Sequence, residues 1–189
     1  MFMSVVNSDL VQVNDAIATA YWTRAVDRGA DAPLGVGALE GGKDSIGFLV
    51  TATALSGAGV LGCARVAMPG QGWALRLDEV AFPVGAVAHR HTHSGSGWRC
   101  LVAGSLRIEA EDHTTIMKTG DYWFEPAHSP VRAVALHGAG VTRFVRCMVI
   151  PLADLGRSTF QLCTPKDADL PRLQVTHRHF DHTVQVDAG

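Results

Sequence analysis

The segment GAVAHRHTHSGSGWRCLVAG, residues 85–104, holds the features that decide the fold. His91 and His93 stand two positions apart, at what is expected to be the end of a strand. Side chains at positions i and i+2 of a strand lie on the same face of the sheet. Both imidazoles are therefore predicted to point into one cavity, which is the arrangement that a metal ion bound by neutral ring nitrogens requires.

The composition narrows the class of protein. The chain has 189 residues, of which 47% are hydrophobic and 18% charged, which suits one domain with a buried core. A formal net charge of −2 implies no basic face, so nucleic acid is not an expected partner. The four cysteines form no C-x-x-C pair, which is typical of reduced thiols in a cytoplasmic protein.

Neither of two segments that could direct export or membrane insertion is interpreted that way. Residues 1–10 have no basic start and no sustained apolar run, so they do not resemble a signal peptide. Residues 46–63 carry no charge, but Thr, Ser, Gly and Ala dilute their apolar character. Two buried strands around the turn SGAG explain this stretch better, and no membrane partner is expected.

The chain divides into three predicted parts. Leu10, Val13, Ile17 and Tyr21 recur at helical spacing, which predicts a helix over residues 9–28 followed by a linker to residue 45. Residues 46–150 contain many short β-branched and aromatic runs separated by glycine-rich turns, which is typical of an antiparallel β-sandwich or barrel. Residues 151–189 form a C-terminal arm expected to pack on residues 46–150 or on a partner subunit. A homodimer through edge strands is the expected assembly.

The glycine spacing around the histidines repeats further along the chain. Gly85 lies six residues before His91, and Gly104 closes the first run; Gly120 lies six residues before Pro126. Over roughly residues 73–150 the chain resembles the cupin superfamily, whose two motifs have this order and spacing. The resemblance implies a small antiparallel β-barrel of jelly-roll type with its site inside, here preceded by the short N-terminal helix.

Two of the four metal ligands usual in that family are missing. The family's glutamate falls on Gly97 or Trp98, and its third histidine falls on Val131. His128 is the candidate substitute, so the predicted metal ligands are His91, His93 and His128. The resemblance implies Fe, Mn, Ni or Zn as the metal and, if the protein is an enzyme, a metal-dependent dioxygenase or isomerase acting on a small organic molecule.

The residues after the loop SGSG point to a second possibility. If position 97 faces inward, strand alternation also turns Arg99 inward, where its guanidinium would repel a divalent cation and favour a carboxylate. If the register differs by one residue, Trp98 faces inward instead. Arg99, Trp98 and Trp123 are therefore the predicted ligand-binding residues; Trp123 can also pack in the core.

Three functions remain open at this point. The first is a metal-dependent enzyme, the second a metal-free sensor or binding protein for a small carboxylate-bearing molecule, and the third a structural dimer with an empty barrel. No nucleophile–base pair is evident, so no catalytic residue is assigned.

The C-terminal segment THRHFDH, residues 176–182, resembles the histidine box of metallo-β-lactamases. Only residues 183–189 follow it, so a site of that type is not expected. We predict a terminal strand on which His177, His179 and Asp181 share a face and which pairs with an edge of the barrel or of a second subunit. The role of this group, with His182, is left open.

Overall fold

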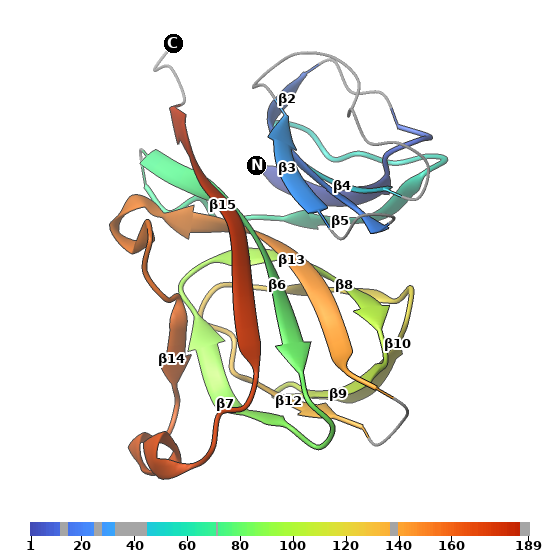
Figure 1. Ribbon diagram of the computed structural model, residues 1–189. Coiled ribbons are helices and arrows are strands. Elements are labelled where there is room, and N and C mark those ends of the chain that lie inside the picture. Colours follow the sequence, from blue (N-terminus) through green and yellow to red (C-terminus); the bar gives the residue numbers. More distant parts are fainter. Residues whose placement is uncertain (12–14, 25–27, 33–44, 71, 137–139, 186–189) are drawn as a thin grey trace.

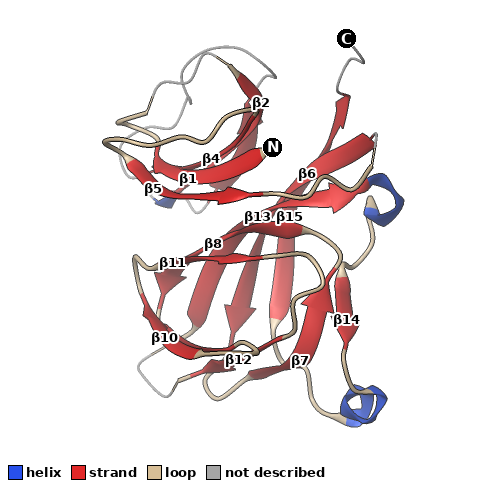
Figure 2. Cartoon of the chain, turned by 180° about the vertical axis from the view of Figure 1, so that it is seen from behind, coloured by secondary structure: helices blue, strands red, loops and turns tan. Residues whose placement is uncertain are grey.

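The computed structural model describes residues 1–11, 15–24, 28–32, 45–70, 72–136 and 140–185. These residues form three five-stranded sheets in which every paired strand is antiparallel (Figure 1). The expectation of a mainly β, antiparallel protein is thereby confirmed. Two complete 3-10 turns lie within the described part of the chain, η2 (Leu152–Asp154) and η3 (Pro165–Asp169) (Figure 2).

The three sheets are named here by position. The N-terminal sheet has the order β3-β2-β4-β1-β5 and contains β1 (Phe2–Asn7), β2 (Ala16–Thr23), β3 (Arg28–Ala32), β4 (Ser45–Thr51) and β5 (Val60–Arg65). The central sheet has the order β11-β8-β13-β6-β15 and contains β6 (Gly72–Phe82), β8 (Ser96–Ala103), β11 (Tyr122–Glu125), β13 (Thr142–Pro151) and β15 (Val175–Gln185). The outer sheet has the order β10-β9-β12-β7-β14 and contains β7 (Val87–His93), β9 (Ser105–Glu109), β10 (Thr114–Lys118), β12 (Val131–Ala135) and β14 (Phe160–Leu162).

The prediction of an N-terminal helix over residues 9–28 is wrong. Residues 16–23 form β2, and its alternate residues Ala16, Ala18, Ala20 and Trp22 are buried. This alternation has the period of a strand, and it outweighs the helical spacing of Ile17 and Tyr21. Leu10, which was expected on the buried face of the helix, is 64% exposed, and Val13 lies outside the described residues.

The central sheet is buried on both faces. Trp73, Leu75, Trp98 and Val145 on one face pack in a single core with Met3, Trp22 and Phe48 of the N-terminal sheet. Val80, Phe82, Leu101 and Phe144 on the other face pack in a second core with Leu106, Ile108 and Val131 of the outer sheet. Packing on both faces explains why the residues of β6 and β13 are almost continuously buried, including the charged Arg76, Asp78 and Arg146.

The resemblance implied a closed barrel, but the structure shows that the sheets do not close into one. In the described part of the chain, no ladder joins the central sheet to the outer sheet, and the two face one another as separate layers. Each of these sheets has a short strand at one edge: β14 has 3 residues and β11 has 4. Two antiparallel sheets packed face to face are the arrangement of a jelly roll.

The expected boundary between residues 45 and 46 falls at the start of β4. In the structure β4 and β5 pair with β1, so they belong to the same sheet as β2 and β3. The division of the chain into three parts stays a prediction, as does homodimerisation through an edge strand.

The C-terminal strand is confirmed, and it pairs with β6 of the same chain. The prediction that His177, His179 and Asp181 share a face holds for the two histidines, whose ring centroids lie 4.8 Å apart, and is wrong for Asp181, because the register shifts between Arg178 and Phe180. His179 Nε2 lies 2.7 Å from Glu79 Oε1, whereas Asp181 accepts hydrogen bonds from Arg76, which lines the cavity described below.

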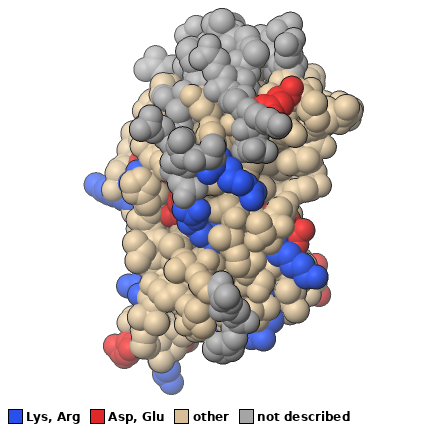
Figure 3. Space-filling view, turned by 45° about the vertical axis from the view of Figure 1, so that its right-hand side comes forward, with Lys and Arg blue, Asp and Glu red and all other residues tan. Residues whose placement is uncertain are grey.

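The described residues include no helix long and apolar enough to cross a bilayer. On the face shown in Figure 3, basic and acidic side chains are interspersed.

Candidate functional site

A cavity of about 560 Å³ lies between the central and outer sheets. Its apolar wall comes from both sheets and includes Val80, Phe82, Ile108, Val131 and Phe144. Residues of the C-terminal arm line another side, namely Ser158, Thr159, Phe160, Arg172, Gln174, Thr176 and Arg178. The volume is that of a pocket for a small organic molecule.

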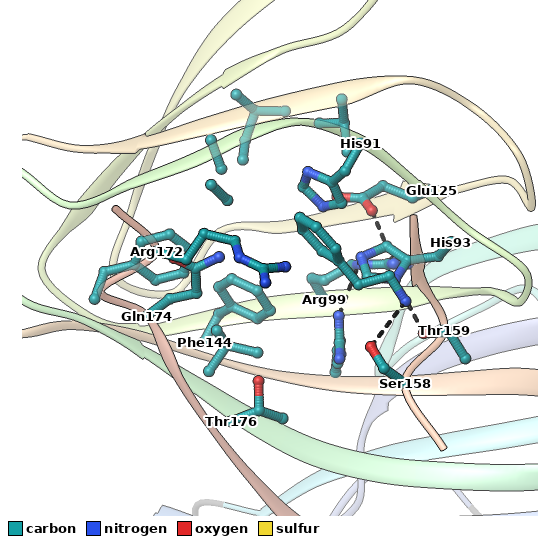
Figure 4. A pocket seen from close by; sticks show the side chains of 18 of the residues that line it. His91, His93, Arg99, Glu125, Phe144, Ser158, Thr159, Arg172, Gln174 and Thr176 are labelled. Carbon is teal, nitrogen blue, oxygen red and sulfur yellow. Dashed lines mark hydrogen bonds and ion pairs between the residues drawn. The ribbon is translucent and has the colours of Figure 1, made fainter. Parts of the chain in front are cut away.

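His91 and His93 project from β7 into this cavity, as strand alternation predicted (Figure 4). Their ring centroids are 4.9 Å apart and the rings are nearly perpendicular. Both side chains are buried, with exposed fractions of 5%. The His91 ring also stacks on Phe160 of β14, with 4.2 Å between centroids.

The hydrogen bonds define the tautomer of each ring. His91 Nδ1 lies 2.7 Å from the carbonyl oxygen of His89, so Nδ1 carries the proton and donates it, and Nε2 keeps its lone pair. His93 Nε2 lies 3.2 Å from Nη1 of Arg146, and since a guanidinium can only donate, Nε2 accepts. His93 Nδ1 therefore carries the proton and donates to Oγ1 of Thr159, 3.0 Å away.

Both imidazoles are neutral near pH 7. Burial, partly opposed by the charge of Glu125, lowers the pKa of His91 to about 4. Burial, together with the charges of Arg146 and Arg99, lowers the pKa of His93 well below its ordinary value.

A row of charged side chains crosses the central sheet beneath the histidines. Strand register places Arg99 of β8 beside Arg146 of β13, and Arg146 beside Asp78 of β6. Asp78 is fully buried and binds Arg146 through both carboxylate oxygens. Burial lowers the pKa of Arg99 to about 10, although Glu125 opposes this, so the guanidinium stays charged at neutral pH.

Glu125 supplies the carboxylate that faces the histidines. Its Oε2 lies 2.8 Å from Nη2 of Arg99, and its Oε1 accepts a hydrogen bond of 2.7 Å from the Trp123 indole. Trp123 and Glu125 are alternate residues of β11, so strand geometry turns both toward the cavity. The ion pair neutralises Arg99, which leaves it less available to an anionic ligand than the sequence implied.

Arg172 is the cavity cation that lacks such a partner. In the described residues no carboxylate pairs with it, whereas Arg76, Arg99, Arg146 and Arg178 each have one. Its guanidinium carbon lies 5.6 Å from the centroid of the Phe160 ring, a cation–π contact. Figure 4 shows Arg172 and Gln174 at one end of the cavity and His91, His93 and Glu125 at the other, with Phe144 between them.

The structure brings four of the six predicted site residues to the cavity: His91, His93, Arg99 and Trp123. Trp98 lies on the opposite face of β8, where its indole packs against Gly62 and donates to the carbonyl of Met3 at 2.8 Å. The register with Arg99 inward is the one observed.

His128 also lies outside the cavity. Its side chain is exposed, its backbone is left-handed (φ 62°), and its N–H donates to the carbonyl of His93 at 2.7 Å. The residue therefore supports β7 through its backbone, and its imidazole does not join the other two.

The donor set does not fit a divalent metal. The lone pair of His93 is taken by Arg146, Glu125 is held by Arg99 and Trp123, and two guanidinium charges lie beside the histidines. Within the described ranges, no three His, Cys, Asp or Glu side chains are placed to hold one ion.

Sequence reasoning missed Glu125, Arg146, Phe160 and Arg172. Two of them carried a signal: Glu125 alternates with Trp123 in the run YWFE, and Arg146 alternates with Phe144 in the run RFVRCM. Phe160 and Arg172 come from the arm, whose path over the cavity has no periodic pattern to reveal it.

A family model and several solved structures match part of the chain. Residues 78–145 match the family model described as "Cupin domain". DMSP lyase DddQ from Ruegeria pomeroyi DSS-3 aligns with 20% identity and a TM-score of 0.43 over 49% of this chain and 45% of that one. The chain thus spans less than half of that lyase.

Two shorter structures align over more of their own length. An RmlC-like cupin from Shewanella frigidimarina NCIMB 400 shares 18% identity, with a TM-score of 0.37, over 47% of this chain and 85% of its own. KdgF from Halomonas sp. shares 24% identity, with a TM-score of 0.36, over 42% of this chain and 74% of its own. No curated protein matches the chain.

Proposed function

Because residues 78–145 match a cupin domain, we propose that the cavity between the central and outer sheets binds a small organic molecule carrying a carboxylate. The observation that carries this proposal is Arg172, which lines the cavity and has no carboxylate partner among the described residues. The Arg172 side chain is exposed, and its planar guanidinium can bind a carboxylate in a bidentate manner.

The rest of the cavity supports an amphipathic ligand. Val80, Phe82 and Phe144 offer apolar surface to a hydrocarbon or aromatic body. The neutral His91 ring offers Nε2 as a hydrogen-bond acceptor at the far end. We therefore place the carboxylate at Arg172, the apolar body along Phe144, and a polar group of the ligand near His91.

Isothermal titration calorimetry with 3-phenylpropionate tests this function, with the uncharged 3-phenylpropan-1-ol as the matched ligand. The acid is expected to bind at least about tenfold more tightly than the alcohol, a difference of about 1.4 kcal/mol. Arg172→Gln should remove that preference, whereas the exposed Arg65→Gln, with the same change in net charge, should keep it. Equal affinities for acid and alcohol in the unaltered protein would contradict the proposal.

The metal-dependent dioxygenase or isomerase is the competing function. It is favoured by one observation, the placement of His91, His93 and Glu125 in one cavity. Metal analysis of protein prepared without a histidine tag separates the two: stoichiometric metal that is lost in His91→Ala supports the enzyme.

A further inference from the structure

The contact between Arg146 and His93 occupies the atom that a metal would need. His93 has two ring nitrogens: Nδ1 donates to Thr159, and Nε2 accepts from Arg146 at 3.2 Å. A metal ion binds the lone pair of a neutral imidazole nitrogen, and on His93 that lone pair faces the guanidinium.

The guanidinium is held firmly in that position. Nε and Nη2 of Arg146 bind the two oxygens of Asp78, whose side chain has no exposed surface. The connected residues Asp78, Arg146, His93 and Thr159 come from β6, β13, β7 and the arm, so the network crosses the cavity from the central sheet to the outer sheet. A metal at His93 would have to displace a buried cation and leave Asp78 without its partner.

We infer that Arg146 takes the place of a metal ion at His93, acting as a permanent cation of the cavity and excluding divalent metals from the histidine pair. The charge of arginine cannot be removed by deprotonation in a protein, so this cation is present at every physiological pH. The inference concerns the histidine end of the cavity and does not depend on a carboxylate binding at Arg172.

The test removes the cation together with its counterion. In Arg146→Met/Asp78→Asn the lone pair of His93 becomes free, and no unpaired buried carboxylate is created that could itself bind metal. Titration of tag-free protein with CoCl2, followed by visible absorption and calorimetry, should show at least about a tenfold gain in affinity over the unaltered protein. Adding His93→Ala to the double variant should abolish the gain.

A second ion pair in the same cavity is the matched control. Arg76 lines the cavity and binds Asp181 at 2.6 and 2.7 Å, with no hydrogen bond to either cavity histidine. Arg76→Met/Asp181→Asn therefore removes the same charges and should gain no His93-dependent cobalt binding. A gain as large in this variant as in Arg146→Met/Asp78→Asn would overturn the inference.

A measurement on the unaltered protein keeps the inference testable if the double variant does not fold. Nitrogen-15 NMR of the imidazoles should show the neutral Nδ1-protonated form of His93, unchanged when one equivalent of ZnCl2 is added. A shift of the His93 Nε2 resonance on zinc addition would overturn the inference. No carboxylate ligand is added in either metal-binding experiment. The outcome of these experiments is therefore separate from the test of carboxylate binding at Arg172.

Discussion

Glu125 lies directly opposite Gly97, on the neighbouring strands β11 and β8. Position 97 is where the cupin motif leads one to expect an acidic ligand, yet a Cβ atom there would collide with the backbone carbonyl of Cys147. The carboxylate of this cavity is therefore supplied by the adjacent strand, and Arg99 pairs with it at 2.8 Å.

The pair of Glu125 and Arg99 is predicted to matter for stability. Arg99 is 1% exposed, so Glu125→Gln leaves a buried guanidinium without a counterion and should lower the free energy of unfolding by about 3 kcal/mol. Urea denaturation measures the change. Glu109→Gln is the matched control, because its pair with Arg132 is about one-third exposed and should cost less than about 1 kcal/mol. Similar losses in both variants would contradict this role of Glu125.

Gly97 is predicted to tolerate no side chain. Gly97→Ala places a methyl group against the Cys147 carbonyl of β13, so β8 and β13 must separate. We expect a loss of about 1–3 kcal/mol, the usual range for overpacking a core. Restoring the family's acid with Gly97→Glu should be worse still and should not create a metal site. Denaturant melts that leave Gly97→Ala within about 0.5 kcal/mol of the unaltered protein would contradict the steric argument.

Much of the fold was predictable because it depends on local patterns. Glycine spacing and strand alternation indicated the cupin segment, the common face of His91 and His93, and the inward register of Arg99. The N-terminal helix was mispredicted because Ile17 and Tyr21 fit a helical period, and only pairing of β2 with β4 shows which period prevails. Separation into two sheets depends on which edge strands pair, and no local pattern encodes that.

The cavity was less predictable because its chemistry arises between distant segments. The tautomer of His93 depends on Arg146 and Thr159, which lie 53 and 66 residues away in sequence. Arg172 reaches the cavity by way of an arm without regular periodicity. The residue types were visible in the sequence, but the pairing that neutralises Arg99 and leaves Arg172 without a counterion was not.

Trp98 and Trp123 are predicted to have opposite roles. Trp98→Phe removes the indole that donates to the Met3 carbonyl between two sheets, so it should lower stability by about 1–3 kcal/mol and leave the affinity for 3-phenylpropionate unchanged. Trp123→Phe removes the indole that donates to Glu125 in the cavity, so it should weaken binding of that ligand. Calorimetry and urea melts on both variants check this. Weaker binding in Trp98→Phe alone would contradict the placement of these side chains.

Acid is predicted to destabilise the protein through its buried histidines. In the unfolded chain an imidazole titrates near its ordinary pKa of 6.5, whereas burial lowers the pKa of His91 in the folded protein to about 4. As the pH falls below 6.5, the unfolded state takes up a proton that the folded state does not, so stability decreases toward pH 4. His93, whose pKa is lowered in the same direction, adds to the loss.

For His91 alone the expected loss between pH 7 and pH 5 is about 2 kcal/mol. Urea denaturation at both pH values measures it. His91→Gln should fold at pH 7, because the side chain lines the cavity and belongs to neither hydrophobic core, and it should reduce the pH-dependent loss by about 2 kcal/mol. An equal loss in His91→Gln and the unaltered protein would show that His91 accepts a proton in the folded state near its ordinary pKa, contrary to its burial between β7 and Phe160.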